Sequence, residues 1–387
     1  MDYKEYLSLL PGPVSVPRRV MNAMLKPIIG HRSREFKELY TRLQEGLKYL
    51  FKTRNFIAIL SASGTAAVEF AIANTISNGD KVLLIDTGFF SGTRASKTIE
   101  AYGGIPIHLK APLGYAPTYD DVMKALDNHR DLKAILVVYS ETSTGVLVKD
   151  LKDICIEANN RGLITIVDAV SAAGGVELMV DDWCIDLCAS ASQKCLAAPP
   201  GISFVSISEK IVEEVYRCKP RSLYLSLREY LEYSSSSEVP FTPSIPLFYA
   251  LSEALDMLVE EGLENRIARH RIISKAFYNG LEVLGFKPLP RLEYRSPTIV
   301  AVEPPENISV DKVVSMLRDR YGILVARGMG ELRDRIIRIG CMGMISSMEV
   351  FYTLQSIENT LIEFGCKIEP GSSVLEASKT LAGSLCI

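Results

Sequence analysis

The chain has 387 residues, of which 48% are hydrophobic and 23% are charged, and its formal net charge is −3. This length is ample for a large hydrophobic core and suggests two or three domain units. A charge balance so close to zero gives no reason to expect nucleic acid or an anionic membrane as a partner.

Several classes of protein lack their sequence signature here. No apolar run approaches the roughly 20 residues of a membrane span, and the first residues show no signal-peptide pattern, so we expect a cytoplasmic protein. The eight cysteines form no CxxC pair, which predicts reduced thiols and no metal site. The absence of GxGxxG, GxxxxGK[ST], GxSxG and HExxH motifs disfavours nicotinamide enzymes, P-loop proteins, serine hydrolases and zinc proteases.

The N-terminal quarter of the chain predicts an extended arm, helices and a first strand. Residues 9–13, Leu-Leu-Pro-Gly-Pro, cannot lie inside a helix. A short helix is expected at 20–25. A loop through Gly30 then leads to Ser33, which is the expected N-cap of a helix over 36–51.

A strand over 56–60 is followed by a turn of small residues and a helix over 66–76. The turn contains Ser63, Gly64 and Thr65. A strand, a small-residue turn and a helix together present free backbone N–H groups and the positive end of a helix to an anion. Serine and threonine are also preferred helix caps, so this stretch alone is equally consistent with a well-capped helix.

An acid and a lysine form the most informative pair in the chain. Residues 163–167 read as a buried strand, and Asp168 stands at its C-terminal end, where open α/β sheets bind ligands. Lys194 follows in Ser-Gln-Lys among small residues. A lysine amine can form a Schiff base with an aldehyde cofactor, and an aspartate can keep a pyridine nitrogen protonated. Alone, the aspartate could be a helix cap and the lysine a solvated surface residue.

Before a domain boundary near residue 262, strands are expected at 134–139 and 201–207 and a helix at 246–261. Beyond it, the chain predicts a smaller unit with strands at 298–302 and 336–339 and a helix at 310–321. Arg338 lies in the last strand, and its guanidinium must find an anion there, because burying it unpaired is costly. That anion is either an internal carboxylate or the carboxylate of a substrate.

Asp168-Ala169-Val170 followed by Ser192-Gln193-Lys194 resembles the class V, fold type I, pyridoxal phosphate (PLP) aminotransferases. The likeness is greatest to the serine:pyruvate and alanine:glyoxylate branch, and it runs from Leu9 to Gly340. It implies an α/β fold with an N-terminal arm (1–20), a large PLP-binding domain with a mostly parallel sheet (21–261) and a smaller C-terminal α/β domain (262–387).

The resemblance also implies roles for individual residues. Lys194 would carry PLP and Asp168 would contact its ring nitrogen, while Arg338 and Gly30 would face the substrate. Thr242 would reach the phosphate of a partner subunit in a homodimer, although Val239 stands where some relatives have a tyrosine. The remaining cofactor contacts would be Ser63, Gly64, Thr65, Phe90, Thr142, Val170 and Gln193. The stretch after the strand at 81–86 is one residue longer than the family pattern, so Phe89 competes with Phe90 as the aromatic that stacks on the ring.

The implied reaction is transamination between serine or alanine and pyruvate or glyoxylate. Aspartate or an aminophosphonate remains an alternative donor, because small changes in an apolar pocket shift preference by only about 1–3 kcal/mol. A cysteine desulfurase would need a nucleophilic cysteine on a mobile loop, and residues 327–330 contain none. A catalytically silent module would be expected to lack the lysine or its acid partner.

Overall fold

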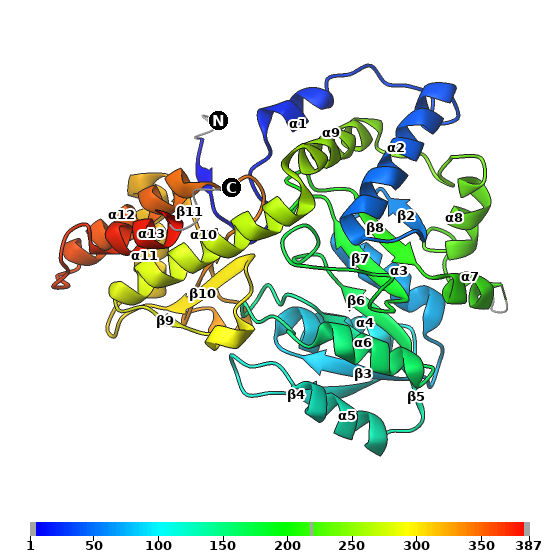
Figure 1. Cartoon of the computed structure of the whole chain (residues 1–387), viewed down its shortest axis with the longest axis horizontal. Coiled ribbons are helices and arrows are strands. Elements are labelled where there is room, and N and C mark those ends of the chain that lie inside the picture. Colours follow the sequence, from blue (N-terminus) through cyan, green and yellow to red (C-terminus); the bar gives the residue numbers. More distant parts are fainter. Residues whose placement is uncertain (1–4, 217–219, 383–387) are drawn as a thin grey trace.

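A seven-stranded sheet forms the centre of the chain in the computed structural model, which describes residues 5–216 and 220–382 (Figure 1). The strand order is β2-β8-β7-β6-β5-β3-β4, and β8 alone runs antiparallel to its neighbours. The expected mostly parallel α/β sheet is therefore confirmed. Its strands are Phe56–Leu60 (β2), Lys81–Asp86 (β3), Ile105–Lys110 (β4), Leu132–Val138 (β5), Ile164–Asp168 (β6), Leu187–Ala191 (β7) and Ser203–Ile207 (β8).

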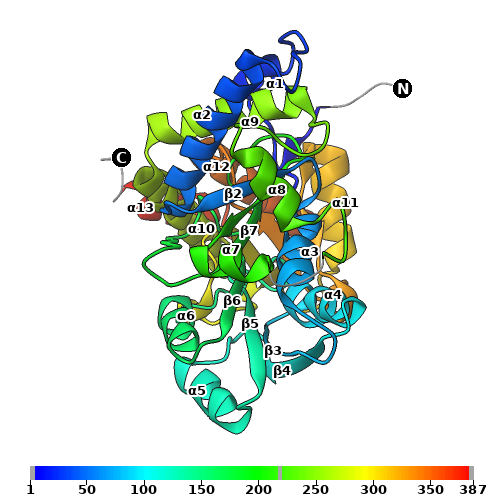
Figure 2. The ribbon, with the colours of Figure 1, turned by 90° about the vertical axis from the view of Figure 1, so that its right-hand side faces the viewer.

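Helices cover both faces of this sheet, because its strands bury apolar side chains on both faces. In β3, Leu83 and Ile85 pack into one core while Val82 and Leu84 pack into the other. Figure 2 shows α3 and α4 on one side of the sheet and α5 and α6 on the other. The helices of this part are Arg34–Phe51 (α2), Gly64–Thr75 (α3), Ser96–Ala101 (α4), Tyr119–Asn128 (α5), Leu151–Asn160 (α6), Glu209–Val215 (α7), Leu227–Ser234 (α8) and Ile245–Glu261 (α9).

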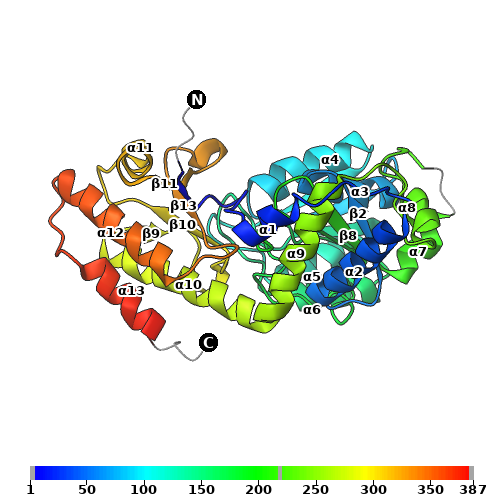
Figure 3. The ribbon, with the colours of Figure 1, turned by 90° about the horizontal axis from the view of Figure 1, so that it is seen from above.

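The C-terminal part is built on a small antiparallel sheet of order β12-β13-β10-β9, with its own hydrophobic core. The predicted boundary at residue 262 falls on Gly262, which has a left-handed φ of +82° between α9 and α10. Figure 3 shows α10 to α13 beside the large sheet. The elements are Leu263–Val283 (α10), Lys287–Pro288 (β9), Ile299–Glu303 (β10), Val310–Tyr321 (α11), Ile323–Leu324 (β11), Ala326–Arg327 (β12), Ile337–Gly340 (β13), Ser347–Glu363 (α12) and Ser372–Ala382 (α13).

The N-terminal arm crosses from one part to the other. Leu7–Ser8 (β1) pairs in parallel with β11, and Leu9 is buried in the C-terminal core. The N–H of Gly340 donates to the Leu9 carbonyl at 2.7 Å. Arg18–Ala23 (α1) then packs against α9 in the large part. The arm therefore connects the C-terminal part with the large part.

Helix starts differ most from the sequence-based expectation. α1 begins two residues earlier than predicted, directly after Pro17, whose fixed φ suits the start of a helix. α3 also begins two residues early, at Gly64, so Gly64 and Thr65 belong to its first turn. Ser33 caps α2 as expected and accepts from the N–H of Phe36.

The described residues also bear on the predicted thiols, metal and membrane. The six cysteines among them are free, while Cys218 and Cys386 lie outside the described ranges. Those ranges contain no group of histidine, cysteine and acidic side chains suited to a metal ion. No helix within them is both long and apolar enough to cross a membrane.

A buried ion cluster stabilises the junction of α9 and α10. Glu261 accepts from Arg266 Nε at 2.7 Å and from Arg269 Nε at 2.6 Å. The side chain of Arg266 is fully buried, and its Nη1 also donates to the Cys195 carbonyl at 3.4 Å. Arg269 donates to the carbonyls of Gly343 and Ile345, both at 2.9 Å. One carboxylate thus holds the helix junction to the loops that follow Lys194 and β13.

We expect Glu261→Gln to lower the free energy of unfolding by about 3 kcal/mol, because it leaves the buried guanidinium of Arg266 without its counter-charge. The shift of the urea midpoint measures this loss. Glu264→Gln is the matched control. It breaks an exposed pair with Lys52 at 3.0 Å, which is worth at most about 1 kcal/mol. Equal shifts for the two variants would contradict the assignment of the cluster.

Candidate active site

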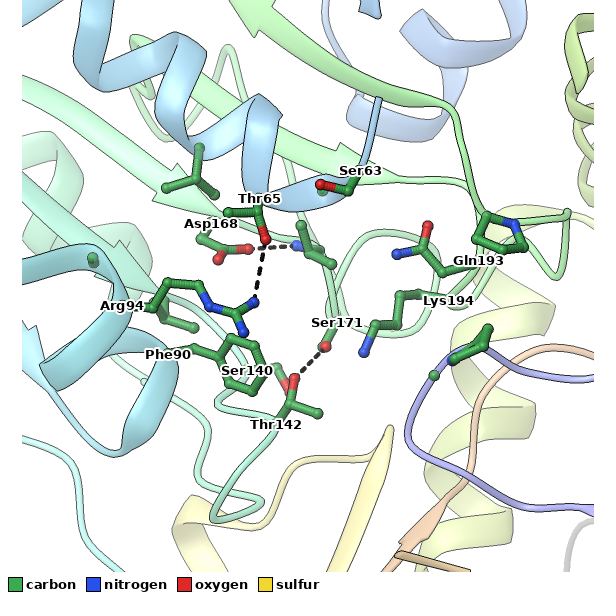
Figure 4. A pocket seen from close by; sticks show the side chains of 18 of the residues that line it. Ser63, Thr65, Phe90, Arg94, Ser140, Thr142, Asp168, Ser171, Gln193 and Lys194 are labelled. Atoms are coloured by element: carbon green, nitrogen blue, oxygen red, sulfur yellow. Dashed lines mark hydrogen bonds between the residues drawn. The ribbon is translucent and has the colours of Figure 1, made fainter. Parts of the chain in front are cut away.

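A cavity of about 260 Å³ opens at the C-terminal edge of the large sheet. Val138 and Asp168 line it from the ends of β5 and β6, and Lys194 lies three residues after β7. Ligands bind at this edge in open α/β sheets. Figure 4 shows Asp168 and Lys194 facing a common space. Nine residues singled out in the sequence line the cavity, namely Ser63, Gly64, Thr65, Phe90, Thr142, Asp168, Val170, Gln193 and Lys194.

Lys194 presents a buried amine to this cavity. Its side chain is only 8% exposed, and Nζ donates to the carbonyl of Pro11 in the N-terminal arm. Burial lowers the pKa of Lys194 to about 8, since an ammonium loses hydration there. The nearby cations Arg338 and Arg94 lower this pKa further, whereas Cys195 and Asp168 raise it. About a tenth of the amine is therefore neutral and nucleophilic at pH 7, far more than for an exposed lysine.

Asp168 is the last residue of β6 and lines the cavity beside Lys194. Its Oδ1 accepts from the N–H of Val170 at 2.9 Å. Burial raises the pKa of Asp168 to about 6, the charge of Glu141 adds to the rise, and the Val170 N–H, Lys194 and Arg94 oppose it. A buried carboxylate in this setting is stabilised by a cationic or N–H partner from a ligand.

The start of α3 also lines the cavity, through Ser63, Gly64 and Thr65. Ser63 is its N-cap but makes no side-chain capping bond, and the first N–H groups of a helix have no partners within the helix. Gln193 also lines the cavity, and its buried Oε1 has no hydrogen-bond partner among the described residues. The helix end forms a cradle for an anion, whereas the unpartnered Oε1 of Gln193 is an acceptor and suits a donor group instead.

A π-helix, η1 (Phe89–Ala95), follows β3 and forms another wall. A π-helical turn accommodates one extra residue in a helix, and the segment expected to be one residue longer than the family pattern forms this turn. Phe90 lines the cavity and Phe89 does not. Arg94 lies over the Phe90 ring, with its guanidinium carbon 4.5 Å from the ring centroid, and donates to Thr65 Oγ1 at 3.2 Å.

Arg338 lies on β13 close to the cavity but outside its lining. Its Nε donates to the carbonyl of Arg327 and its Nη1 to that of Thr142, both at 2.9 Å. Burial lowers the pKa of Arg338 to about 10, and the charge of Glu141 opposes this. The described residues include no carboxylate within ion-pair distance of Arg338, so the internal salt bridge considered from the sequence is not present among them.

The other two sequence-predicted residues are elsewhere. Gly30 and Thr242 are exposed and do not line this cavity. Their predicted roles, toward substrate and toward a partner's phosphate, remain predictions.

Sequence reasoning missed several lining residues, namely Gly12, Pro13, Arg94, Ser140 and Ser171. Ser171 Oγ shares a 2.6 Å hydrogen bond with Thr142 Oγ1. Gly12 and Pro13 belong to the Pro/Gly-rich arm, which was the one available signal for close approach. Arg94 had none, because it resembles any helical surface arginine until the tertiary structure places it over Phe90.

Comparison with known proteins identifies the family. A family model described as aminotransferase class-V matches residues 19–332. The chain belongs to this family. An uncharacterized aminotransferase of Methanocaldococcus jannaschii is 40% identical over 95% of this chain and 96% of its own. The serine–glyoxylate aminotransferase of Methylorubrum extorquens is 31% identical over 96% of this chain and 95% of its own.

A solved structure agrees with this assignment. The ureidoglycine–glyoxylate aminotransferase of Bacillus subtilis superposes with a TM-score of 0.92 at 28% identity, covering 99% of each chain. The chain is therefore a PLP-dependent aminotransferase of class V with the fold type I architecture. The fold and cofactor implied by the sequence resemblance are confirmed.

The residues that line the cavity suit this cofactor. The buried amine of Lys194 matches an aldehyde, and the buried carboxylate of Asp168 matches a pyridinium N–H. The start of α3 matches a phosphate group. Gly64 lets the start of α3 pack closely against the strand edge that carries the site, because a Cβ there would lie 3.1 Å from side-chain atoms of Ala191 and Val170.

We expect Gly12→Ala to displace Lys194 and reduce PLP uptake at least tenfold. The added Cβ would lie 2.5 Å from Lys194 Cε, and the φ of +101° at Gly12 strains any other residue. Absorbance titration of the apoenzyme with PLP measures the effect. Gly79→Ala is the control, because that glycine has an equally left-handed φ of +85° but no atom within 4 Å of an added Cβ. Equal PLP uptake by the two variants would contradict this role.

The lowered pKa of Lys194 predicts the pH dependence of PLP capture. At pH 7.5 about one quarter of amines with a pKa of about 8 are neutral, against about one in a thousand for an exposed lysine. The capture rate of the apoenzyme, followed by absorbance, should rise with pH and level off above about pH 8. A rate that keeps rising beyond about pH 10 would contradict the burial argument. Lys194→Ala reports the background reaction of surface lysines.

Proposed function

We propose that the enzyme transfers an amino group from a small amino acid, serine or alanine, to a small 2-oxo acid, glyoxylate or pyruvate. The observation that carries this proposal is the meeting of Lys194, Asp168 and the start of α3 at one cavity, with Arg338 beside it. The serine–glyoxylate and ureidoglycine–glyoxylate names of the relatives support glyoxylate as the acceptor.

The small cavity supports small substrates. Its volume of about 260 Å³ is below the roughly 300–1,000 Å³ of typical ligand pockets, and the cofactor takes part of it. Gly12 and Pro13 of the arm close it on the side of Lys194. Little space remains for a long substrate side chain.

Each residue has a separable task in the proposed reaction. PLP, when bound, accepts the amino group and withdraws electrons from the substrate Cα. Lys194 would hold the cofactor and, once released from it, would move the Cα proton, because burial lowers the pKa of its amine toward the working pH. Asp168 binds the ring nitrogen, and Phe90 packs on a face of the ring. Arg338 binds the substrate carboxylate and so orients the Cα–H bond.

We also propose a homodimer in the cytoplasm. Thr242 is exposed and lies outside the cavity of its own chain, which suits the inter-subunit phosphate contact implied by the family resemblance. Leu25 and Ile28 between α1 and α2 are 82% and 70% exposed, and such apolar side chains favour burial against a second copy. The free cysteines suit a reducing compartment.

Absorbance spectroscopy of the holoenzyme tests the reaction directly. L-serine, L-alanine and L-aspartate are added in turn without an acceptor. One of the first two should convert the visible band of bound PLP to the near-ultraviolet band of pyridoxamine phosphate, and glyoxylate or pyruvate should restore it. Conversion by aspartate alone would replace the proposed donor. Survival of the covalent band in Lys194→Ala would remove the basis of the proposal.

We expect Arg338→Gln to raise the KM for the amino acid about 10–100-fold, since a charged hydrogen-bonded pair is worth about 1.5–3 kcal/mol. The effect on kcat should be smaller, and steady-state kinetics at saturating PLP separate the two constants. Arg335→Gln is the control, because Arg335 is exposed and paired with Glu303 at 2.7 Å. An unchanged KM in Arg338→Gln would assign the substrate carboxylate to another residue.

A further inference from the structure

Glu141 is a fully buried carboxylate that the proposed reaction leaves without a task. It lies three residues after β5, next to Thr142, and is 0% exposed. No described lysine or arginine lies within ion-pair distance of it. Its partners are five donors instead. A buried charge is costly unless hydrogen bonds compensate it, so the arrangement of these donors shows what the carboxylate stabilises.

The donors come from the start of η1 and from Ser143. Oε1 accepts from the N–H of Phe90 at 3.3 Å, and Oε2 accepts from the N–H of Ser91 at 2.9 Å. The hydroxyl of Ser91 donates to Oε2 at 3.0 Å. The N–H and hydroxyl of Ser143 both donate to Oε1, at 3.0 and 2.6 Å. An ionised carboxylate suits this set because it only accepts hydrogen bonds.

Glu141 and Ser143 together cap η1 from a different loop. Ser143 Oγ accepts from the N–H of Phe89 at 2.8 Å, so the first three N–H groups of η1 all end on this pair. These groups have no partners within their own helix, and a negative charge beside them is favoured by the helix dipole. The cap therefore sets the position of the helical turn that carries Phe90.

The approach of the two segments is too close for a side chain between them. A Cβ on Gly88 would lie 2.4 Å from Ser143 Oγ and 2.7 Å from Glu141 Cγ. Gly88 precedes η1 directly and has extended backbone, so the glycine is explained by space rather than by strain. The 141–145 turn therefore packs tightly against the residue that precedes η1, with no room for a side chain at Gly88.

Glu141 also connects to the substrate side of the cavity. The carbonyl of the adjacent Thr142 accepts from Arg338 Nη1 at 2.9 Å, and the Thr142 hydroxyl bonds Ser171. The charge of Glu141 raises the pKa of both Asp168 and Arg338. One buried group therefore touches the ring wall through η1 and the substrate arginine through Thr142.

We propose that Glu141 is a positioning residue that holds the Phe90 wall of the cofactor cavity at a fixed place relative to Thr142 and Arg338. It acts through η1 and does not contact substrate. The proposal rests on the PLP cofactor of the proposed function but on neither of its substrates.

The chain offers a matched control in Glu358 on α12. This carboxylate is also 0% exposed and accepts from backbone N–H groups, those of Gly371 and Ser373, and from the Ser373 hydroxyl at 2.7 Å. It fixes the start of α13 in the C-terminal part. Glu358→Gln therefore imposes a comparable loss of buried hydrogen bonds away from the cofactor cavity.

The test compares Glu141→Gln with Glu358→Gln in PLP affinity and in the visible circular dichroism per bound PLP. A glutamine keeps one acceptor, so some buried donors lose their partner at a cost of about 1–3 kcal/mol. We expect the PLP Kd of Glu141→Gln to rise about 10–100-fold and its dichroic band to change, because the band reports how the ring sits against its wall. Glu358→Gln should lose similar thermal stability and keep both PLP properties.

A second pair decides the question if Glu141→Gln does not fold. Ser143→Ala and Ser373→Ala each remove a buried hydroxyl that donates to the respective carboxylate. Ser143→Ala should weaken PLP binding severalfold, and Ser373→Ala should not. The decisive variant is whichever of Glu141→Gln and Ser143→Ala folds. If its PLP Kd and its dichroic band stay unchanged within about twofold, the proposal is overturned. These measurements concern PLP alone. They therefore keep their meaning if the enzyme uses a donor or an acceptor other than the proposed ones.

Discussion

The low-polarity setting of the Lys194 amine is the constraint on which the active site depends. An ammonium in the cavity loses hydration, and the compensation available is a carbonyl of the N-terminal arm and the nearby Asp168. The same burial pushes the pKa of Lys194 down and that of Asp168 up, so the two groups approach each other in proton affinity. A cofactor with an aldehyde and a basic ring nitrogen removes two unfavourable terms at once, the burial of the Lys194 ammonium and the burial of the Asp168 carboxylate.

The architecture explains how one amine comes to be buried by so many segments. Parallel strands bring Asp168, the turn after β5 and the segment after β7 to the same edge of the sheet. The arm then closes this edge, because β1 is anchored on β11 and Leu9 on β13. The C-terminal part thus contributes to the site through Arg338 and through the arm that it holds.

Two hydrogen-bonded carboxylates, the half-buried Glu261 and the fully buried Glu141, connect this site to the rest of the molecule. Glu261 holds two arginines at the α9–α10 junction, and these reach the loops after Lys194 and β13. Glu141 caps η1 and borders the residue that Arg338 contacts. Both are charges in poor solvent, so their geometry is tightly specified by the donors around them. Rigid positioning of this kind is what an orientation-dependent proton transfer requires.

The sequence by itself predicted the sheet, the turn at 63–65 and the Asp168–Lys194 pair from local patterns. The family resemblance supplied the cofactor and the remaining predicted residues of the cavity. The resemblance also indicated one extra residue after the strand at 81–86, but it predicted no helix there and left the choice between Phe89 and Phe90 open. Tertiary structure decided what depends on contacts distant in sequence. These are the choice of Phe90, the approach of Gly12 to Lys194, the place of Arg94 and the cap formed by Glu141. The physical reason is that a side chain's pKa, partners and free space are set by segments that meet only when the sheet and the arm are assembled.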